Sequence, residues 1–235
     1  MLACRSSDPV AVRLLAQHPK VSSAVHDDFP GLGFGDRAIL INDFSVAVRG
    51  LPEIMDNNPL VCANKACIPG PGETMALIAL APILRAGLTL EELIIQTNAP
   101  VSEPALGQFI GDLCALLAHE PFVEPVEYEE CLVLVARMLL AEELQPQQID
   151  DLYQESYGRS FFVQHLESPL GVPPAVHGSP AGFYRCRTEK GGGVTLVTCE
   201  VFADQNGKAG AAQLIHVMNI MCGFEENLGI PESVN

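Results

Sequence analysis

The stretch at residues 58–87, NPLVCANKACIPGPGETMALIALAPILRAG, runs from a short polar segment that contains Cys67 into a strongly apolar pattern. Thr74 can cap a helix over residues 75–86, and Gly87 can end it. Because this helix is apolar nearly all round, we expect it to be buried in the core or in an oligomer interface. The stretch therefore predicts a central helix whose entrance carries a cysteine.

Helix and strand patterns alternate on both sides of this stretch. Asp8 and Pro9 open a first helix, and Gln145 and Pro146 open an amphipathic helix that ends at Gly158. Apolar runs separated by turn residues predict strands, whereas residues 26–36 are typical of a loop. The predicted strands cover 37–48, 90–98, 128–140, 160–166, 182–187 and 193–202, and further helices cover 104–118 and 207–223. This interleaving predicts an α+β fold with a mixed or antiparallel sheet covered by helices.

The composition is that of a folded protein with an acidic surface. Of the 235 residues, 48% are hydrophobic and 18% are charged, which is enough apolar material for a sizeable core. The net charge of −16 repels nucleic-acid phosphates and anionic lipid, so we expect neither nucleic acid nor a membrane as a partner. No apolar leader or bilayer-length apolar run is visible, so we expect a cytoplasmic location.

The eight cysteines are scattered, and no two of them have C-x-x-C spacing. A zinc site needs short paired spacings with histidines nearby, so we expect no metal. Cysteines within apolar runs, such as Cys131 and Cys199, are expected to pack as small buried hydrophobes.

Several segments, in the same order, resemble the N-acetyl-gamma-glutamyl-phosphate reductases of the aspartate-semialdehyde dehydrogenase superfamily. GLPEI at 50–54 followed by LVCANKACIP at 60–69 is similar to that family's Y-G-L-P-E and V-A-N-P-G-C-Y-P-T. ALIALAPILRAGL at 76–88 looks like the helix after its catalytic cysteine, and GKAGAAQLIHVMNIMCG at 207–223 is close to its K-G-A-A-G-Q-A-V-Q-N-M-N-L-M-F-G. The resemblance implies that family's catalytic and dimerisation domain at residues 61–235, including a C-terminal helix at 208–222. A truncated Rossmann-like remnant at residues 1–60 would precede it.

The front of the chain departs from the family's pattern. The sequence does not match the family's opening strand, the family's G-x-x-G-x-x-G phosphate loop or most of the family's later Rossmann strands. The helix at Pro9 follows MLACRSSD, which contains no glycine. Such a loop needs glycines so that backbone amides can close on a pyrophosphate at a helix N-terminus. We therefore expect no cofactor, although the resemblance implies NADP for the family itself.

The resemblance implies that Cys67 is the nucleophile and that Asn64 is the family residue kept before it. A nucleophilic cysteine needs a lowered thiol pKa, which a nearby helix N-terminus can provide. Four extra residues, GPGE at 70–73, are expected to move Cys67 away from the helix start. Glu73 would then raise the pKa of the thiol, and Lys65 would offset this effect.

Two further functional residues of the family have no counterpart in this sequence. Its acid/base histidine falls at Ser102, and no arginine stands in QTNAPVS at 96–102 to hold an anionic substrate. His119 is the candidate substitute base, and the alternative is that it caps a helix or lies on the surface. His177 and His216 are expected to be structural.

Two hypotheses about function follow. In the first, a reductase-like protein has lost NADP-dependent hydride transfer and serves as a binding or scaffold protein for a small acidic metabolite or a protein partner. In the second, Cys67 is the nucleophile of an active reductase, hydrolase or acyltransferase that acts on an acyl phosphate or a thioester-like substrate. Both imply a homo-oligomer, which we expect to be a dimer.

Overall fold

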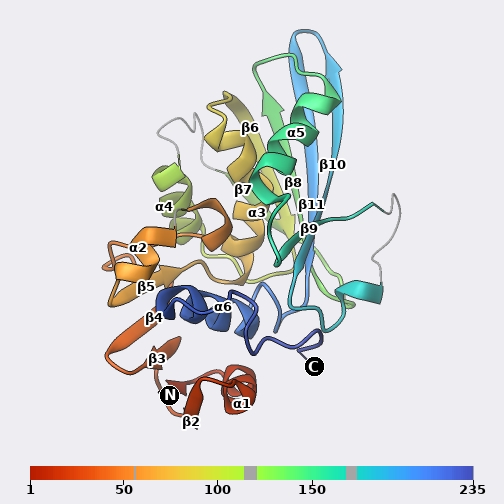
Figure 1. Cartoon of the computed structure of the whole chain (residues 1–235). Helices are drawn as coiled ribbons and strands as arrows, with labels where there is room; N and C mark the ends of the chain where they lie inside the picture. Colours follow the sequence, from red (N-terminus) through yellow and green to blue (C-terminus); the bar gives the residue numbers. More distant parts are fainter. Residues whose placement is uncertain (56, 114–120, 168–173, 235) are drawn as a thin grey trace.

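Two mixed β-sheets with covering helices make up the fold (Figure 1). The computed structural model describes residues 1–55, 57–113, 121–167 and 174–234. The first sheet has five strands in the order β2-β1-β3-β4-β5, and the second has six in the order β7-β6-β8-β11-β10-β9. This confirms the predicted α+β class.

The N-terminal sheet begins with a strand–helix–strand unit. β1 (Leu2–Ser6) leads into α1 (Pro9–Gln17), and β2 (Val21–His26) pairs parallel to β1. The predicted lack of an opening strand is therefore wrong. Only Cys4 and Ser6 of β1 are buried, so the strand carries almost no apolar signal.

The predicted loop at residues 26–36 is also partly wrong, because β3 (Leu32–Phe34) lies within it. β3 pairs antiparallel with both β1 and β4 (Arg37–Ile41), and β5 (Lys65–Ile68) adds parallel to β4. The predicted strand at 37–48 stops at Ile41, because Asn42 turns into the left-handed region with φ 52°. A short 3-10 helix, η1 (Pro52–Ile54), and the unpredicted helix α2 (Asn57–Cys62) follow.

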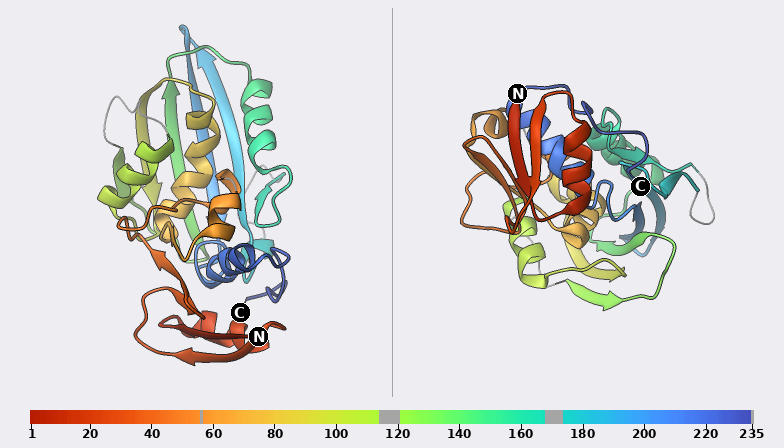
Figure 2. Two further views of the ribbon diagram at one scale, coloured as in Figure 1. Left: turned by 60° about the vertical axis from the view of Figure 1, so that its left-hand side comes forward. Right: turned by 90° about the horizontal axis from the view of Figure 1, so that it is seen from below.

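The larger sheet carries its helices on one face (Figures 1 and 2). Its strands are β6 (Leu90–Thr97), β7 (Phe122–Pro125), β8 (Leu132–Leu140), β9 (Val163–His165), β10 (Gly182–Gly191) and β11 (Val194–Ala203). The helices are α3 (Pro71–Arg85), α4 (Glu103–Leu113) and α5 (Pro146–Tyr157), and the short η2 (Pro174–Val176) precedes β10. The predicted strands of this sheet are confirmed, but β7 was missed and β9 is shorter than predicted.

The central helix α3 is buried from Gly72 to Leu84, as its apolar pattern predicts. It begins earlier than predicted, at Pro71 with Gly70 as its N-cap, so Thr74 is not a cap. The Thr74 hydroxyl instead donates to the carbonyl oxygen of Pro69 at 3.1 Å from inside the first turn. Pro71 explains the earlier start, because proline at the first helical position has a fixed φ and no amide to satisfy.

Pro82 lies inside α3 and leaves the carbonyl of Ile78 without its usual amide donor. The hydroxyl of Tyr157 on α5 donates to this carbonyl at 3.1 Å, and that of Tyr153 donates to the carbonyl of Ala79. A buried proline is thus tolerated because a neighbouring helix supplies the missing donor.

Helix α6 (Ala211–Cys222) lies between the N-terminal sheet and the larger unit (Figure 1). It packs against α1 and α2 and is buried from Ala211 to Met221, so both apolar and polar side chains of this helix are enclosed. The N-terminal sheet itself extends to Ile68, because β5 pairs with β4. The proposed division at residue 60 stays a prediction. Among the described residues, no helix is both long enough and apolar enough to cross a bilayer.

Candidate functional site

Cys67 lies inside strand β5 and not at a helix entrance. Its amide donates to the carbonyl of Val48 at 2.9 Å, and its carbonyl accepts from Gly50 at 3.1 Å. The side chain is 1% exposed, and its thiol donates only a weak 3.8 Å contact to the carbonyl of Ile68. Burial, with a smaller contribution from the charge of Asp43, raises the pKa of the thiol from 9.0 to about 11. The predicted influence of Glu73 and Lys65 on this pKa is not among its causes.

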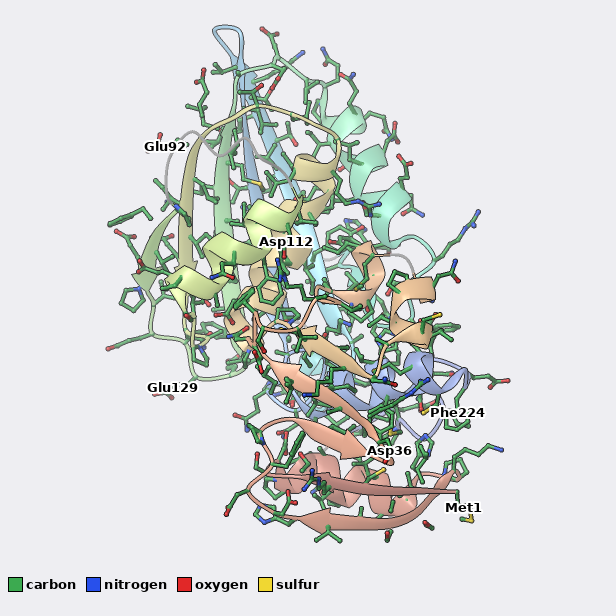
Figure 3. The ribbon with its side chains drawn as sticks, turned by 90° about the vertical axis from the view of Figure 1, so that its left-hand side faces the viewer. Met1, Asp36, Glu92, Asp112, Glu129 and Phe224 are labelled. Atoms are coloured by element: carbon green, nitrogen blue, oxygen red, sulfur yellow. The ribbon has the colours of Figure 1, made fainter. Side chains whose placement is uncertain are left out.

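The segment at residues 42–50 covers Cys67 and is tied down by α4. The ring of Phe44 packs on that of Phe109 with centroids 4.9 Å apart. Arg49 forms a two-pronged ion pair with Asp112, with N–O distances of 2.6 and 2.9 Å. Figure 3 shows Asp112 on α4, above the N-terminal sheet. Cys67 is therefore enclosed by residues 42–50, which are held to α4 by an aromatic contact and an ion pair.

The structure does not bring the other predicted site residues to Cys67. Asn64 is exposed in the turn before β5, and its carbonyl accepts from Ala38 at 2.9 Å. It lines a shallow surface hollow with Arg37 and Phe224, and Cys67 does not line that hollow. His119 lies outside the described residues. The backbone of Asn64 therefore joins the turn before β5 to β4.

The first turn of α3 packs against the segment that leads into α4. The carboxylate of Glu73 accepts a 2.6 Å hydrogen bond from the amide of Ser102, the residue before α4. The amide of Gly72 donates to Pro100 at 3.1 Å, and a Cβ on Gly72 would lie 2.1 Å from a methyl group of Val101. Glu73 is 1% exposed. An internal carboxylate thus occupies the start of the buried helix, where a dipole would otherwise stabilise an anion.

This geometry corrects the expected insertion. Residues 70–73 do not form a separate loop, because they supply the N-cap and first turn of α3. Cys67 lies before this turn, in strand β5.

The start of α1 does not fit a dinucleotide. Asp8 caps this helix, and its Oδ1 accepts from the amides of Val10 at 2.8 Å and Ala11 at 3.1 Å. These are the amides that a pyrophosphate would need, and the carboxylate would repel it. The residues present therefore do not form a phosphate site of the family's kind.

A buried charged cluster was missed from the sequence. Lys208, in the turn before α6, places its Nζ 2.6 Å from Oε1 of Glu53 in η1. His216 of α6 lies 3.8 Å from the same oxygen and shares a 3.0 Å hydrogen bond between its Nε2 and Oε2 of Glu226. The side chains of Lys208 and Glu53 are 1% and 4% exposed. The burial of His216 agrees with its predicted structural role. The cluster itself could not be predicted, because its residues lie far apart in the sequence.

The protonation states in this cluster follow from burial. Desolvation lowers the pKa of Lys208 and that of His216, while the nearby carboxylates oppose both changes. The hydrogen bond from His216 lowers the pKa of Glu226. At neutral pH we therefore take His216 as neutral and Glu226 as ionised.

Two adjoining clefts open beside this cluster. One, of about 320 Å³, is lined by Glu53, Asn57, Arg159, Ser160, His216 and Glu226 among others. The other, of about 390 Å³, is lined by Glu53, Arg85 and Glu155 together with apolar side chains. Glu53, Met55 and Ser156 border both clefts, so the two clefts lie next to each other. Among the described residues, no group of His, Cys, Asp and Glu side chains could hold a metal ion.

Comparison with solved structures identifies the fold. Aspartate semialdehyde dehydrogenase II of Vibrio cholerae matches with a TM-score of 0.52 and 16% identity, over 78% of this chain and 68% of that one. A second structure of the same enzyme matches with a TM-score of 0.53 and 12% identity, over 73% of this chain and 67% of that one. The two-sheet fold is thus that of the semialdehyde dehydrogenases.

Sequence comparison finds similar proteins among the N-acetyl-gamma-glutamyl-phosphate reductases. N-acetyl-gamma-glutamyl-phosphate reductase of Bacillus cereus (strain 03BB102) is 27% identical over 217 residues, which is 78% of this chain and 62% of the relative. The reductase of Desulfotalea psychrophila is 27% identical over 224 residues, which is 79% of this chain and 62% of that relative. No protein-family model matches the chain. The chain is similar to these reductases, has the fold of the semialdehyde dehydrogenases, and spans about 62% of the length of the relatives it matches.

Proposed function

We propose that this protein does not perform the thiol and hydride chemistry of the reductases it resembles, and that it acts as a ligand-binding homo-oligomer. The observation that carries the proposal is the start of α3. The buried carboxylate of Glu73 occupies this turn and accepts a hydrogen bond from the amide of Ser102, while Cys67 is enclosed in β5. Within the described part of the chain, no cysteine lies in the first turn of α3, and a Cβ on Gly72 would clash with residues 100 and 101.

Negative charge on the protein disfavours the binding of NADPH. Hydride transfer would need NADPH, and Asp8 already uses the helix amides that a phosphate would require. The acidic net charge of −16 disfavours a polyanion further. NADP is therefore not part of the proposed function.

The alternative is a thiol enzyme that uses Cys67. One observation favours it: Arg49 and the amides of Asn42 and Asp43 lie close enough to lower the pKa of the thiol. Burial outweighs them and keeps the pKa at about 11, and residues 42–50 would have to move before a substrate could reach the sulfur. This alternative therefore ranks second.

A dimer is proposed through the open face of the larger sheet. All three covering helices lie on the opposite face (Figure 2). Ile94, Leu139 and Leu196 of three neighbouring strands are partly buried on this open face and lie beside the charged Arg137 and Glu200. A mixed apolar and charged face suits a two-fold contact with a second copy. Sedimentation equilibrium should give twice the chain mass of 25.2 kDa, and Leu139→Asp should return it to that single mass.

Turnover tests the loss of chemistry. The purified protein is given N-acetyl-gamma-glutamyl phosphate and NADPH, and NADPH consumption is followed by absorbance. We expect the wild type to match Cys67→Ala and the no-protein blank, because no thiolate is presented to the acyl carbon. Cys62→Ala, at an exposed cysteine, is the matched control. Turnover above the blank would refute the proposal, and its loss in Cys67→Ala alone would establish the thiol-enzyme alternative.

A further inference from the structure

We propose that Cys186 and Cys199 form a modification site, at which hydrogen peroxide converts the two thiols into a cross-strand disulfide. Both cysteines are free thiols in this structure. They lie on β10 and β11, directly opposite each other in the antiparallel register. This pair belongs to the larger sheet, whereas Cys67 lies in β5 of the N-terminal sheet, so the inference does not depend on the proposed function.

The turn of this hairpin decides which kind of pair the two cysteines form. Gly192 and Gly193 are the central residues of the turn, and their φ angles of 67° and 86° are those of a type I′ turn. The two residues that flank such a turn exchange backbone hydrogen bonds, and hydrogen-bonded and non-hydrogen-bonded pairs then alternate along the ladder. Counted from the flanking pair 191–194, this alternation makes Cys186 and Cys199 a non-hydrogen-bonded pair.

A non-hydrogen-bonded pair brings two side chains within the range of a disulfide. Its Cα atoms are about 4.5 Å apart, and its side chains approach more closely than those of a hydrogen-bonded pair. A disulfide accepts Cα separations of about 4.4–6.8 Å, so the bond requires no large movement of the strands. Both side chains lie on the helix-covered face, because Cys199 belongs to the core there and Cys186 packs against that core.

The two thiols also interact with each other. Burial and, after it, a hydrogen bond with the thiol of Cys199 raise the pKa of Cys186. The hydroxyl of Tyr153, from α5, takes part in the same group, because its hydrogen bond to Cys186 opposes this rise. The register and the thiol contact therefore agree that the two sulfur atoms are neighbours.

Cys186 is the thiol that an oxidant can reach. It is half-buried and borders a cleft of about 450 Å³, together with Asp150, His165 and Tyr184 among others. Cys199 has an exposed fraction of 0%, so a reagent does not contact it in the folded protein. Hydrogen peroxide is small and uncharged, so the carboxylates at the cleft do not repel it. Cys186 is therefore oxidised first, and Cys199 attacks it.

The reaction balances with hydrogen peroxide as the oxidant. Cys186 loses its proton, and its sulfur attacks one oxygen of the peroxide; the O–O bond breaks, and the departing hydroxide takes up the proton and leaves as water. Cys186 is then a sulfenic acid, which condenses with a thiol. Cys199 loses its proton, and its sulfur attacks that of Cys186; the S–O bond breaks, and a second water leaves. The two sulfurs have lost two electrons, which the peroxide has gained.

Mass spectrometry of the oxidised full chain tests the proposal. The folded protein is treated with excess hydrogen peroxide at mildly alkaline pH, because the raised pKa of Cys186 leaves little thiolate at neutral pH. It is then alkylated in denaturant and digested without reduction. Trypsin cleaves after Arg187 and Lys190, so the two cysteines fall in different peptides. We expect these two peptides to be linked, two hydrogen atoms lighter than their sum, and to separate on treatment with dithiothreitol.

Three variants assign the steps. In Cys199→Ala, the linked peptide should be absent and dimedone should trap a sulfenic acid at Cys186. In Cys186→Ala, Cys199 should remain a thiol, because it is enclosed. Cys62→Ala, at an exposed cysteine, is the matched control and should leave the linked peptide unchanged.

Two results would overturn the inference. One is a wild-type chain in which the exposed Cys62 is fully oxidised and yet no peptide joins Cys186 to Cys199. The other is direct oxidation of Cys199 in Cys186→Ala at the rate of Cys62. Neither result bears on turnover with NADPH, so the proposed loss of chemistry is judged separately.

Discussion

Alkylation of the folded protein at neutral pH should leave Cys67 essentially unmodified while Cys62 reacts. Raising the pKa of the Cys67 thiol from 9.0 to about 11 lowers its thiolate fraction at pH 7 by roughly 100-fold, because each pKa unit is a factor of ten. The 1% exposure of Cys67 slows reagent access further, whereas Cys62 is exposed. We therefore expect the rate at Cys67 to be at least about 100-fold below that at Cys62. Peptide mapping by mass spectrometry after timed iodoacetamide treatment measures both rates in the wild-type chain.

The pH dependence gives a second readout of the same prediction. The rate at Cys67 should rise about tenfold per pH unit through the range in which the fold is stable, with no plateau near neutrality. Denaturation should bring Cys67 to the rate of Cys62, which controls for sequence effects on reactivity. A plateau below pH 8, or a rate at Cys67 above that of Cys62, would show an activated thiolate and would support the thiol-enzyme alternative.

Replacing Lys208 by Met should cost about 3–5 kcal/mol of unfolding free energy, because it leaves the carboxylate of Glu53 buried without its counter-ion. The Lys208 side chain is 1% exposed, and its Nζ lies 2.6 Å from Oε1 of Glu53. This ion pair joins η1 to the turn before α6, and the Nζ of Lys208 also lies 6.0 Å from the ring centroid of Phe162. Urea denaturation followed by circular dichroism measures the change.

Two companion variants separate charge from packing. Glu53→Leu combined with Lys208→Met removes both charges, and we expect it to recover most of the loss, since an apolar pair can replace a buried ion pair. Lys20→Met, at an exposed lysine, should change stability by less than about 0.5 kcal/mol. A loss below about 1 kcal/mol in Lys208→Met would contradict the description of this ion pair as buried.

Sequence patterns predicted the elements whose burial follows a regular period. The helix opened by Gln145 and Pro146 is α5, with the predicted end at Gly158 and with Ile149, Tyr153 and Tyr157 buried at helical spacing. The hairpin of β10 and β11 turns at the predicted glycines 191–193. In these elements local preference and tertiary packing favour the same structure.

The sequence failed where a few tertiary contacts decide the structure. β1 is polar because only Cys4 and Ser6 face inward. The capping potential of Thr74 predicts a start of α3 after this residue, whereas the helix begins at Pro71, with Gly72 packed on residues 100–101 and Glu73 bonded to Ser102. The cluster of Glu53, Lys208 and His216 joins residues more than 150 positions apart, a proximity that no local pattern encodes. The resemblance singled out the segment around Cys67, but the burial of Cys67 in β5 could not be predicted from the sequence.

Titration of the protein with NADPH, followed by the nicotinamide fluorescence, tests the loss of hydride chemistry most directly. Asp8 is the residue to vary, because its carboxylate occupies the amides of α1. The wild type should give no saturable change up to about 1 mM NADPH, and Asp8→Asn should not create a site, since no glycine loop precedes the helix. Saturable binding to the wild type in the micromolar range would contradict the proposal that this protein does not perform hydride transfer.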